Sequence, residues 1–520
     1  MKKLLALILA LAMVLTLAAC GSSSKGNDAG SPGAKTDTGA SGDGVKDTIV
    51  VGWTRQPEDF DPAFTNNGIG MQLVYEQLFM HNPDTGELEP WLVETYEWLD
   101  DTTLHLTLKD GITFSNGDPL TAEDVIWSMK YYLESGSNLA TYYNVYDFDN
   151  CVIEDNRNFT LKYKQPYGPA LAYLTLPKIQ NKSYYEEFGA DAFWDAPCGS
   201  GPYTCTENVE GSHTSYALRD DYWNKNFTPE VKNFVVKSYR EATTMYIDFE
   251  NGALDMAFGL DANDAERAQK DNGNGYTLHI QPSLDVKMLC LNPAKEEFQN
   301  DLVRQAIACA VEWDKVGEAA FGVMCSKATS TLPTGCSFKI DLEDYTYDAA
   351  KAKQLMEQAG YADGFDVRLV LVNDTYNQRM AEALHAYLAA INIRINIESY
   401  EIATAIPMFM AGETDMVIKT AEGGAFCLEP DQIFDTLKAS STLRAAATNS
   451  EEFDGYLMNG LFSIDPAVRE EMYVKAQQWC HDTCWYIPIC EDSVAYVCAE
   501  GVSLNTVNVH FPYLIFTHLG

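Results

Sequence analysis

Sixteen residues in the C-terminal half of the chain, KTAEGGAFCLEPDQIF (residues 419–434), gather the side chains with the most varied chemistry. They include one lysine, two glutamates, one aspartate, one cysteine and a Gly-Gly pair. A Gly-Gly pair lets the backbone approach a ligand closely, or it simply turns the chain. Three interpretations are therefore open: a catalytic cluster, the wall of a binding site, and a surface turn.

A second cluster, CHDTC at residues 480–484, contains two thiols and an imidazole. On a helix, Cys480 and Cys484 lie one turn apart with His481 on another face, whereas a zinc site needs converging ligands and commonly CxxC spacing. The sequence contains no CxxC motif, and its eight histidines are scattered without an HExxH motif. The sequence therefore predicts neither a metal nor another cofactor.

Sequence signatures of catalysis are missing as well. The chain has no GxSxG, HExxH or GxxxxGK[ST] motif. Its 75 acidic residues provide many combinations for a glycosidase-type pair of carboxylates, but no feature of the sequence supports one. No catalytic residue is predicted.

The composition limits the classes of partner. With 46% hydrophobic and 12% aromatic residues, the chain can bury a sizeable core, and its 520 residues suggest about three structural units. The formal net charge of −39 argues against nucleic acid, whose phosphates need a basic surface. Cationic or zwitterionic partners are compatible with this charge, although solubility alone also explains it.

The first residues indicate export. A positive MKK is followed by LLALILALAMVLTLAA, which is shorter than the ~20 apolar residues of a membrane-spanning helix and is typical of a signal peptide. The segment ends in LAAC, which resembles the lipobox of bacterial lipoproteins, so we expect residues 1–19 to be removed and Cys20 to be acylated. The alternative is an ordinary signal peptide cleaved elsewhere. Residues 20–46 are rich in Gly, Ser and Asp and predict a flexible tether after the lipidated cysteine.

The chain has thirteen cysteines, of which twelve remain after Cys20. An extracytoplasmic location permits disulfides, but their pairing does not follow from the sequence, and free thiols are the alternative. Neighbouring cysteines along the chain give three local candidate pairs: Cys198 with Cys205, Cys325 with Cys336, and Cys490 with Cys498.

The elements that must position these side chains follow from local patterns. The alternation in LHLTL puts Leu104, Leu106 and Leu108 on one face of a strand. TAEDVIWSMKYYL begins with Thr121 as the N-cap of a helix, and Asp124 completes a capping box.

The C-terminal half predicts a β–α–β unit. FDVRLVLV (365–372) is typical of a buried strand, residues 378–390 of a helix, and INIRINI (391–397) of a second strand. A helix also fits residues 348–360, which end on a glycine. This order implies a parallel pair of strands with a crossover helix, and thus an α/β fold with added mixed segments. No internal repeat is found.

Six segments, taken in order along the chain, resemble bacterial extracellular solute-binding proteins of family 5, the oligopeptide, dipeptide and nickel class that serves ABC transporters. The segments are LVYEQLFMHNPDTGELEPWLVETYEW (73–98), LKDGITFSNGDPLTAEDVIWSMK (108–130), CGSGPYTCTENVEGSHTSYALRDDYW (198–223), FQNDLVRQAIACAVEWDKV (298–316), YDAAKAKQLMEQAGY (347–361) and YIPI (486–489). Each is weakly specific alone, but together they cover nearly all of residues 48–520.

The resemblance implies a fold and a division of the chain. The fold is α/β, of the periplasmic-binding-protein-like type II (cluster C), with two lobes, a hinge and an extra domain. The expected divisions are residues 47–78, 198–284 and 489–520 for lobe I, 79–197 for the extra domain, and 285–488 for lobe II. Closure of two lobes around a ligand removes the ligand from water and strengthens its polar contacts.

The resemblance also makes residues 419–434 a cleft loop. In many peptide binders this loop carries an aspartate that pairs with the α-ammonium of the peptide, followed by a DP or EP pair, which Glu429-Pro430 matches. Counting back from that pair, the aspartate position falls at about Phe426. We therefore expect Glu422 to supply the negative charge from a shifted place and Lys419 to face a ligand carboxylate. The alternative for both is a solvated surface position.

Three further regions are candidates for contact with ligand. Strand alternation after YIPI turns one of Glu491 and Asp492 toward the cleft. Trp53 and the pair Asn66 and Asn67 lie in the N-terminal part of lobe I, which contributes to the cleft in the family. For each of them the alternative is a structural role in the core or at the surface.

The expected function is a lipid-anchored solute-binding protein, not an enzyme. It would capture a peptide or another small, cationic solute and deliver it to ABC transporter permease subunits, acting as a monomer on the outer face of the cytoplasmic membrane. That face lies toward the periplasm if the host has an outer membrane. Two alternatives stay open: a secreted hydrolase of an envelope polymer, and a transporter-independent receptor or adhesin on the same fold.

Overall fold

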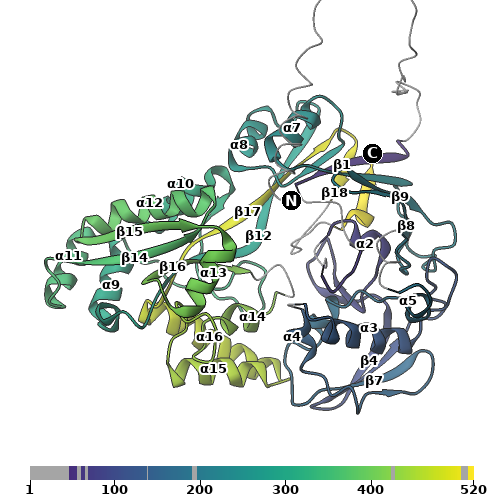
Figure 1. The fold of residues 1–520 in the computed structure, drawn as a ribbon, viewed down its shortest axis with the longest axis horizontal. Helices are drawn as coiled ribbons and strands as arrows, with labels where there is room; N and C mark the ends of the chain where they lie inside the picture. The colour runs from purple at the N-terminus through teal and green to yellow at the C-terminus, as the bar shows by residue number, and fades with distance from the viewer. Residues whose placement is uncertain are drawn as a thin grey trace, which may run out of the picture. The chain divides into compact units, whose positions relative to one another are not determined.

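The computed structural model describes residues 46–54, 60–64, 68–137, 139–189, 196–422, 428–504 and 513–520. Its largest element is a mixed sheet of eleven strands, in the order β15-β14-β16-β12-β17-β11-β1-β10-β9-β8, with β13 paired to β17 (Figure 1). The strands are β1 (Thr48–Trp53), β8 (Tyr203–Val209), β9 (His213–Leu218), β10 (Asn233–Ser238), β11 (Met256–Phe258), β12 (Tyr276–Leu291), β13 (Cys325–Ser326), β14 (Phe365–Val372), β15 (Ile393–Tyr400), β16 (Met416–Glu422) and β17 (Tyr486–Ala499).

Two long antiparallel strands, β12 and β17, carry the sheet from one half of the molecule to the other. The pairing of β12 with β17 has two stretches. One stretch includes the part of β17 that also pairs with β11, and the other includes the part of β12 that also pairs with β16. Between these regions the register shifts from Pro282 to Val286, and Leu284 adopts φ = 68° there. A leucine in the left-handed region is strained, and the ladder between β12 and β17 is interrupted at this point.

The predicted β–α–β unit is present. β14 and β15 pair in parallel over their full lengths, and α12 (Thr375–Ala389) connects them. The helix predicted to end at Gly360 is α11 (Ala349–Gln358), capped by Asp348. The other helices in this half are α9 (Asp301–Ala310), α10 (Trp313–Phe321), α13 (Ile402–Ala411), α14 (Pro430–Asp435), α15 (Glu451–Leu461) and α16 (Pro466–Thr483), with the 3₁₀ turns η2 (Glu296–Gln299) and η3 (Gly322–Met324).

A separate four-stranded antiparallel sheet has the order β4-β5-β7-β6. Its strands are β4 (Val93–Asp100), β5 (Thr103–Leu108), β6 (Val152–Ile153) and β7 (Asn158–Lys162), and α3 (Ala122–Glu134), α4 (Ala140–Tyr143), η1 (Ala172–Thr175) and α5 (Lys182–Phe188) accompany it. We call this part the four-stranded unit. Its capping box is as predicted, with Thr121 and Asp124 each bonding the other's backbone, and Leu104, Leu106 and Leu108 are fully buried.

The remaining elements lie near β1 and β10 in the sequence or at the C-terminus. They are α2 (Met71–Val74), α7 (Ala242–Glu250), α8 (Ala262–Asp271), η4 (Leu514–Phe516), and two small hairpin sheets, β2 (Phe79–His81) with β3 (Leu88–Pro90) and β18 (Val502–Leu504) with β19 (Thr517–Leu519).

One buried carboxylate connects two of the family-like segments, residues 73–98 and 198–223. Glu76 accepts hydrogen bonds from the indole Nε1 of Trp91 (2.9 Å), the hydroxyl of Tyr222 (2.7 Å) and the indole Nε1 of Trp223 (2.8 Å). Burial raises the pKa of Glu76, and these donors oppose that rise. The glutamate, the tryptophans and the tyrosine of those segments therefore have a structural role in joining the elements that carry them.

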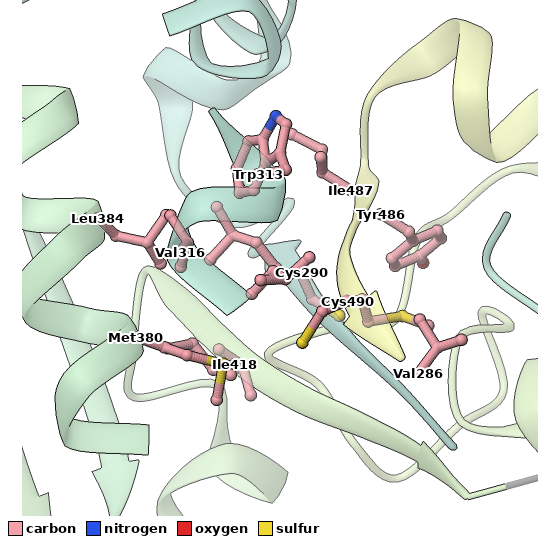
Figure 2. Packing of buried hydrophobic residues seen from close by; sticks show 14 of the residues in the cluster. Val286, Cys290, Trp313, Val316, Met380, Leu384, Ile418, Tyr486, Ile487 and Cys490 are labelled. Carbon is pink, nitrogen blue, oxygen red and sulfur yellow. The ribbon is translucent and has the colours of Figure 1, made fainter. Parts of the chain in front are cut away.

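The buried hydrophobic residues form three clusters. The largest lies between β12, β14, β16 and β17 and their covering helices, the second inside the four-stranded unit, and the third around β1 and β10. Figure 2 shows part of the largest cluster, where side chains from two helices and three strands converge: Trp313, Val316, Met380, Leu384, Val286, Cys290, Ile418, Tyr486, Ile487 and Cys490.

Candidate functional site

The candidate site begins where β16 ends. Glu422 is the last residue of β16, and its register partner on β12 is Asp285. Directly opposed residues on antiparallel strands share a face and lie within about 4.5–5.5 Å at Cβ, so the two carboxylates are neighbours. Asp285 is buried and Glu422 is exposed. Two like charges side by side disfavour each other unless a cation joins them.

Lys419, three residues before Glu422, supplies one positive charge. It is half-buried, and its Nζ donates a hydrogen bond to the carbonyl of Thr420 (3.0 Å). Burial lowers the pKa of Lys419, while the nearby Cys290, Glu422 and Asp285 act in the opposite direction. The ammonium group thus lies in the field of both carboxylates, but the two acids outnumber it.

On the same face of β12, an ion pair lies beside the bulge. Lys287 Nζ is 3.2 Å from Asp492 Oδ2 and donates to Thr420 Oγ1 (3.1 Å), and Ser283 Oγ donates to Asp492 Oδ1 (2.7 Å). Burial alone would lower the pKa of Lys287. The nearby carboxylates of Asp492 and Asp285 have the larger effect, so the pKa of Lys287 is raised. A cavity of about 240 Å³ adjoins this pair, lined by Lys287, Phe321, Tyr376, Asn377, Thr420 and Asp492 among others.

Glu491 and Asp492 lie on opposite faces of β17, with Asp492 on the face of Lys287 and Glu491 in register with Val286. Which of the two faces the cleft stays a prediction. Glu491 is buried and accepts hydrogen bonds from the backbone N–H (3.0 Å) and the hydroxyl (3.2 Å) of Thr334. Burial raises its pKa. Glu491 thus holds the segment around Thr334.

The start of α14 carries a second, different group of charges. Glu429 is buried and lies 2.5 Å from Arg469 of α16, and Ser337 donates to it (3.4 Å). Arg469 also donates to the carbonyls of Gly460 and Gly168, at 3.3 Å each. Burial raises the pKa of Glu429 against the effect of Arg469. This ion pair is therefore buried and held by three further hydrogen bonds.

Two more contacts connect this region to the four-stranded unit. Tyr173 of η1 donates its hydroxyl hydrogen to Asp431 Oδ2 (2.7 Å), and the Gly168 N–H donates to the carbonyl of Leu461 (2.8 Å). Burial, with a contribution from Glu429, raises the pKa of Asp431 to about 7. The other oxygen of Asp431 and the side-chain amide of the adjacent Gln432 have no hydrogen-bond partner among the described residues.

The other predicted residues are placed as follows. Trp53 is the buried last residue of β1 and pairs with Ser238 and Phe258 on the neighbouring strands. Asn66, Asn67, Phe426 and Cys20 lie outside the described residues. The roles expected for all of these residues stay predictions.

The sequence prediction missed Asp285, Asp431 and Arg469. For Arg469 a signal exists, because Arg469, Tyr473, Ala476 and Cys480 recur at helical spacing on one buried stripe of α16. An arginine on such a stripe needs a carboxylate partner. Asp285 offers no comparable local signal.

Two searches of the described residues give negative results. No helix among them is both long and apolar enough to span a bilayer. They also contain no group of three or more His, Cys, Asp or Glu side chains arranged to hold a metal ion. In the CHDTC segment, His481 is hydrogen-bonded to the carbonyl of Glu343 and to Asp482.

Comparison with known proteins decides the family. The sequence model of the bacterial extracellular solute-binding proteins, family 5 Middle, matches residues 87–443. The chain belongs to this family. The two-lobed type II binding-protein fold predicted from the resemblance is confirmed. The family is one of binding proteins, so the prediction that the chain is not an enzyme is also confirmed.

Individual family 5 relatives differ in what they bind. The chain is 28% identical to Heme-binding protein A of Haemophilus influenzae over 94% of each chain. It is 26% identical to the Dipeptide-binding protein of Escherichia coli, over 84% of this chain and 87% of that protein. In structure it is similar to NikA from Brucella suis in complex with Fe(III)-EDTA, with a TM-score of 0.81 and 21% identity, over 91% of this chain and 100% of that chain.

Proposed function

We propose that this family 5 protein captures a peptide or peptide-like solute bearing an ammonium group between its two lobes and delivers it to the permease of an ABC importer. Membership of a solute-binding family supports the general role. The solute class is supported by the arrangement of charges at the end of β16.

The observation that carries the proposal is the register pairing of Asp285 with Glu422. Lys419 lies in the field of both carboxylates, and Lys287 lies in the field of Asp285 and is paired with Asp492. Three acids and two lysines therefore give this place a surplus of one negative charge. An ammonium group brought to this place gains a charge-assisted hydrogen bond and relieves the repulsion between the two acids. Glu422 would therefore replace the aspartate that peptide binders carry near the position of Phe426.

The named ligands of the relatives, a heme, a dipeptide and a metal chelate, differ in their charge. All three carry carboxylates, but of the three only a dipeptide also has a free ammonium group. An acidic strand end favours the last of these. On this proposal Lys419 and Lys287 would balance the carboxylate end of a zwitterion, and Asp431 and Gln432 would offer it further polar contacts.

We propose that capture proceeds by closure about the bulge of β12 and β17. Gly168 and Tyr173 of the four-stranded unit contact the α14–α16 region, which the proposed division assigns to lobe II. In the sequence, Gly168 and Tyr173 lie outside β12 and β17, the strands about which the lobes would close. A solute that contacts both lobes favours the state in which such contacts form, and it shifts the population by its difference in affinity for the two states.

The division of the chain proposed from the sequence remains 47–78, 198–284 and 489–520 for lobe I, 79–197 for the extra domain, and 285–488 for lobe II. The separate hydrophobic cluster of the four-stranded unit supports an extra domain. We further propose acylation at Cys20, a tether over residues 20–46, and a monomer held at the outer face of the cytoplasmic membrane.

Calorimetric titration of the purified mature chain with short peptides tests the proposal. Each peptide is offered with a free N-terminus and with an acetylated N-terminus. We expect stoichiometric binding of the free form and at least ten-fold weaker binding of the acetylated form, and chromatography should recover the peptide unchanged. Equal binding of both forms would refute the ammonium contact, and binding of neither would refute the peptide class.

A further inference from the structure

Two thiols from distant parts of the chain meet on one face of the large sheet. Cys325 opens the two-residue strand β13, and Cys490 lies in β17. The antiparallel register pairs Cys325 with Asp492 and Ser326 with Glu491. Cys325 and Cys490 are therefore diagonal neighbours, two positions apart on the same face, and diagonal side chains are within reach of each other.

A glycine of α10 shows how closely the two sulfur atoms approach. A Cβ atom added at Gly317 would lie 2.7 Å from Cys325 Sγ and 2.9 Å from Cys490 Sγ. Both sulfurs thus lie against the same point of the helix backbone, where no side chain separates them. The two thiols are also hydrogen-bonded to each other.

The two thiols differ in exposure and in acidity. Cys325 is half-buried and can be reached from solvent, whereas Cys490 is fully buried. The hydrogen bond from Cys490 lowers the pKa of Cys325, and the same bond together with burial raises the pKa of Cys490. A thiolate is the nucleophile in thiol–disulfide exchange, so Cys325 is suited to attack first and Cys490 to attack second.

We infer that Cys325 and Cys490 are the partners of an intramolecular disulfide, formed by exchange with a disulfide-bearing oxidant, R–S–S–R. The Cys325 thiolate attacks one sulfur of the oxidant and releases one thiolate, RS⁻. Cys490 then gives its proton to solvent and attacks Cys325 Sγ in the mixed disulfide, which releases the second RS⁻. Two protein thiols are oxidised, and one disulfide is reduced to two thiols.

The surroundings favour this pairing over two of the local pairs. Cys490 and Cys498 lie on one extended strand, and at about 3.3 Å per residue they are too far apart for a disulfide. Cys325 would have to leave its contact with Cys490 to reach Cys336. β13 has only two residues, so it can make the small shift that a diagonal disulfide requires. An extracellular protein family also works where disulfides persist.

The bond would tie β13 to the hinge strand next to Lys287, the register partner of Cys490. It would restrict the unfolded chain strongly, because a large loop lies between the two cysteines. Oxidation should therefore raise the thermal midpoint of the protein by several degrees, and dithiothreitol should reverse the increase.

The test treats the purified mature chain with oxidised glutathione and maps its peptides by mass spectrometry without reduction. We expect one linked pair of peptides containing Cys325 and Cys490, which dithiothreitol separates. In Cys490→Ser, glutathione should remain attached to Cys325, and in Cys325→Ser the midpoint should no longer respond to oxidant. Cys205→Ser, which changes a half-buried thiol on β8, should keep the link.

Three outcomes would overturn the inference. They are recovery of both cysteines as free thiols after oxidation, a stable glutathione adduct on Cys325 of the unmutated protein, and linkage of either cysteine to a different partner. Cys325 is only half-buried, so Cys325→Ser is expected to fold and keeps the test decisive if Cys490→Ser does not.

Discussion

The described residues just before and just after positions 423–427 differ in how their charged groups are paired and exposed. Before them, at the end of β16, Glu422 is exposed beside Asp285, and the half-buried Lys419 and Lys287 lie in the field of this pair. After them, at the start of α14, Glu429 is buried against Arg469, whose guanidinium also donates to two backbone carbonyls. The carboxylate of Glu422 is thus accessible to solvent, whereas the ion pair of Glu429 and Arg469 is buried.

On the proposed function, this difference would separate ligand-binding residues from structural residues within one short segment. An enclosed ion pair cannot exchange a partner for a solute without exposing a buried charge, so Glu429 and Arg469 fix the position of α14. An exposed acid beside a second acid can accept a cation with little rearrangement. The comparison therefore predicts stability effects on the α14 side and affinity effects on the β16 side.

The largest effect is expected for Arg469→Met. Removing the guanidinium leaves Glu429 buried without a cation, which costs about 3–5 kcal/mol of unfolding free energy. Denaturant unfolding measures this loss. The double variant Arg469→Met with Glu429→Gln should recover part of it. Arg394→Met, which breaks an exposed pair with Asp366, is the matched control and should cost under about 1 kcal/mol. Equal losses at the two sites would contradict the comparison.

Glu422→Gln should act on affinity instead. The variant keeps the shape of the side chain but loses the charge, so the free-amine peptide should bind about ten-fold more weakly, equivalent to about 1.4 kcal/mol. Its thermal midpoint without peptide should be unchanged. Glu357→Gln removes an equally exposed charge on α11 and should leave binding unaltered. Unchanged affinity in Glu422→Gln would remove this residue from the site.

Gly168→Ala tests the contact between the four-stranded unit and the α14–α16 region, on the side of the comparison that contains Arg469. The added Cβ would lie 2.4 Å from Arg469 Nε and 2.6 Å from the carbonyl oxygen of Ser463, so the segments must separate. Because closure would use this contact, we expect peptide affinity to fall about five-fold by calorimetry, or about 1 kcal/mol. Gly455→Ala in α15, where a Cβ meets no atom within 4 Å, should show no loss. Equal affinities of the two variants would show that closure does not depend on Gly168.

The smallest effect concerns pH. The pKa of Asp431 is raised to about 7, above the usual value near 3.8, so the folded state keeps this proton over a range in which the unfolded state has lost it. The resulting stability is fully present below pH 4 and is lost as the pH rises through 7. Because the side chain is partly exposed, we expect a change of about 1 kcal/mol.

The difference between the unmutated protein and Asp431→Asn isolates this contribution, since asparagine keeps an acceptor for Tyr173. Urea unfolding at pH 4.5 and at pH 7.5 measures the difference. It should favour the unmutated protein more strongly at the lower pH, and a difference independent of pH would contradict the raised pKa.

Local patterns explain which parts of the fold the sequence predicts. The β14–α12–β15 unit and the capped helix α3 follow from side-chain period and capping residues that lie within a few positions of one another. The pairing of Asp285 with Glu422, or of Glu429 with Arg469, joins residues far apart in the chain. No periodicity in the sequence encodes such contacts. The sequence therefore indicated residues 419–434 as a candidate site, but it did not indicate which distant residues lie beside them.

The order of the strands in the large sheet has a consequence for how the protein melts. Three hydrophobic clusters would ordinarily suggest three calorimetric transitions. However, β12 and β17 are hydrogen-bonded to each other on both sides of the bulge, so unfolding of either lobe strips edge pairings from the other. The two lobes should therefore absorb heat in one cooperative peak, and a ligand that stabilises one lobe should raise the melting temperature of both.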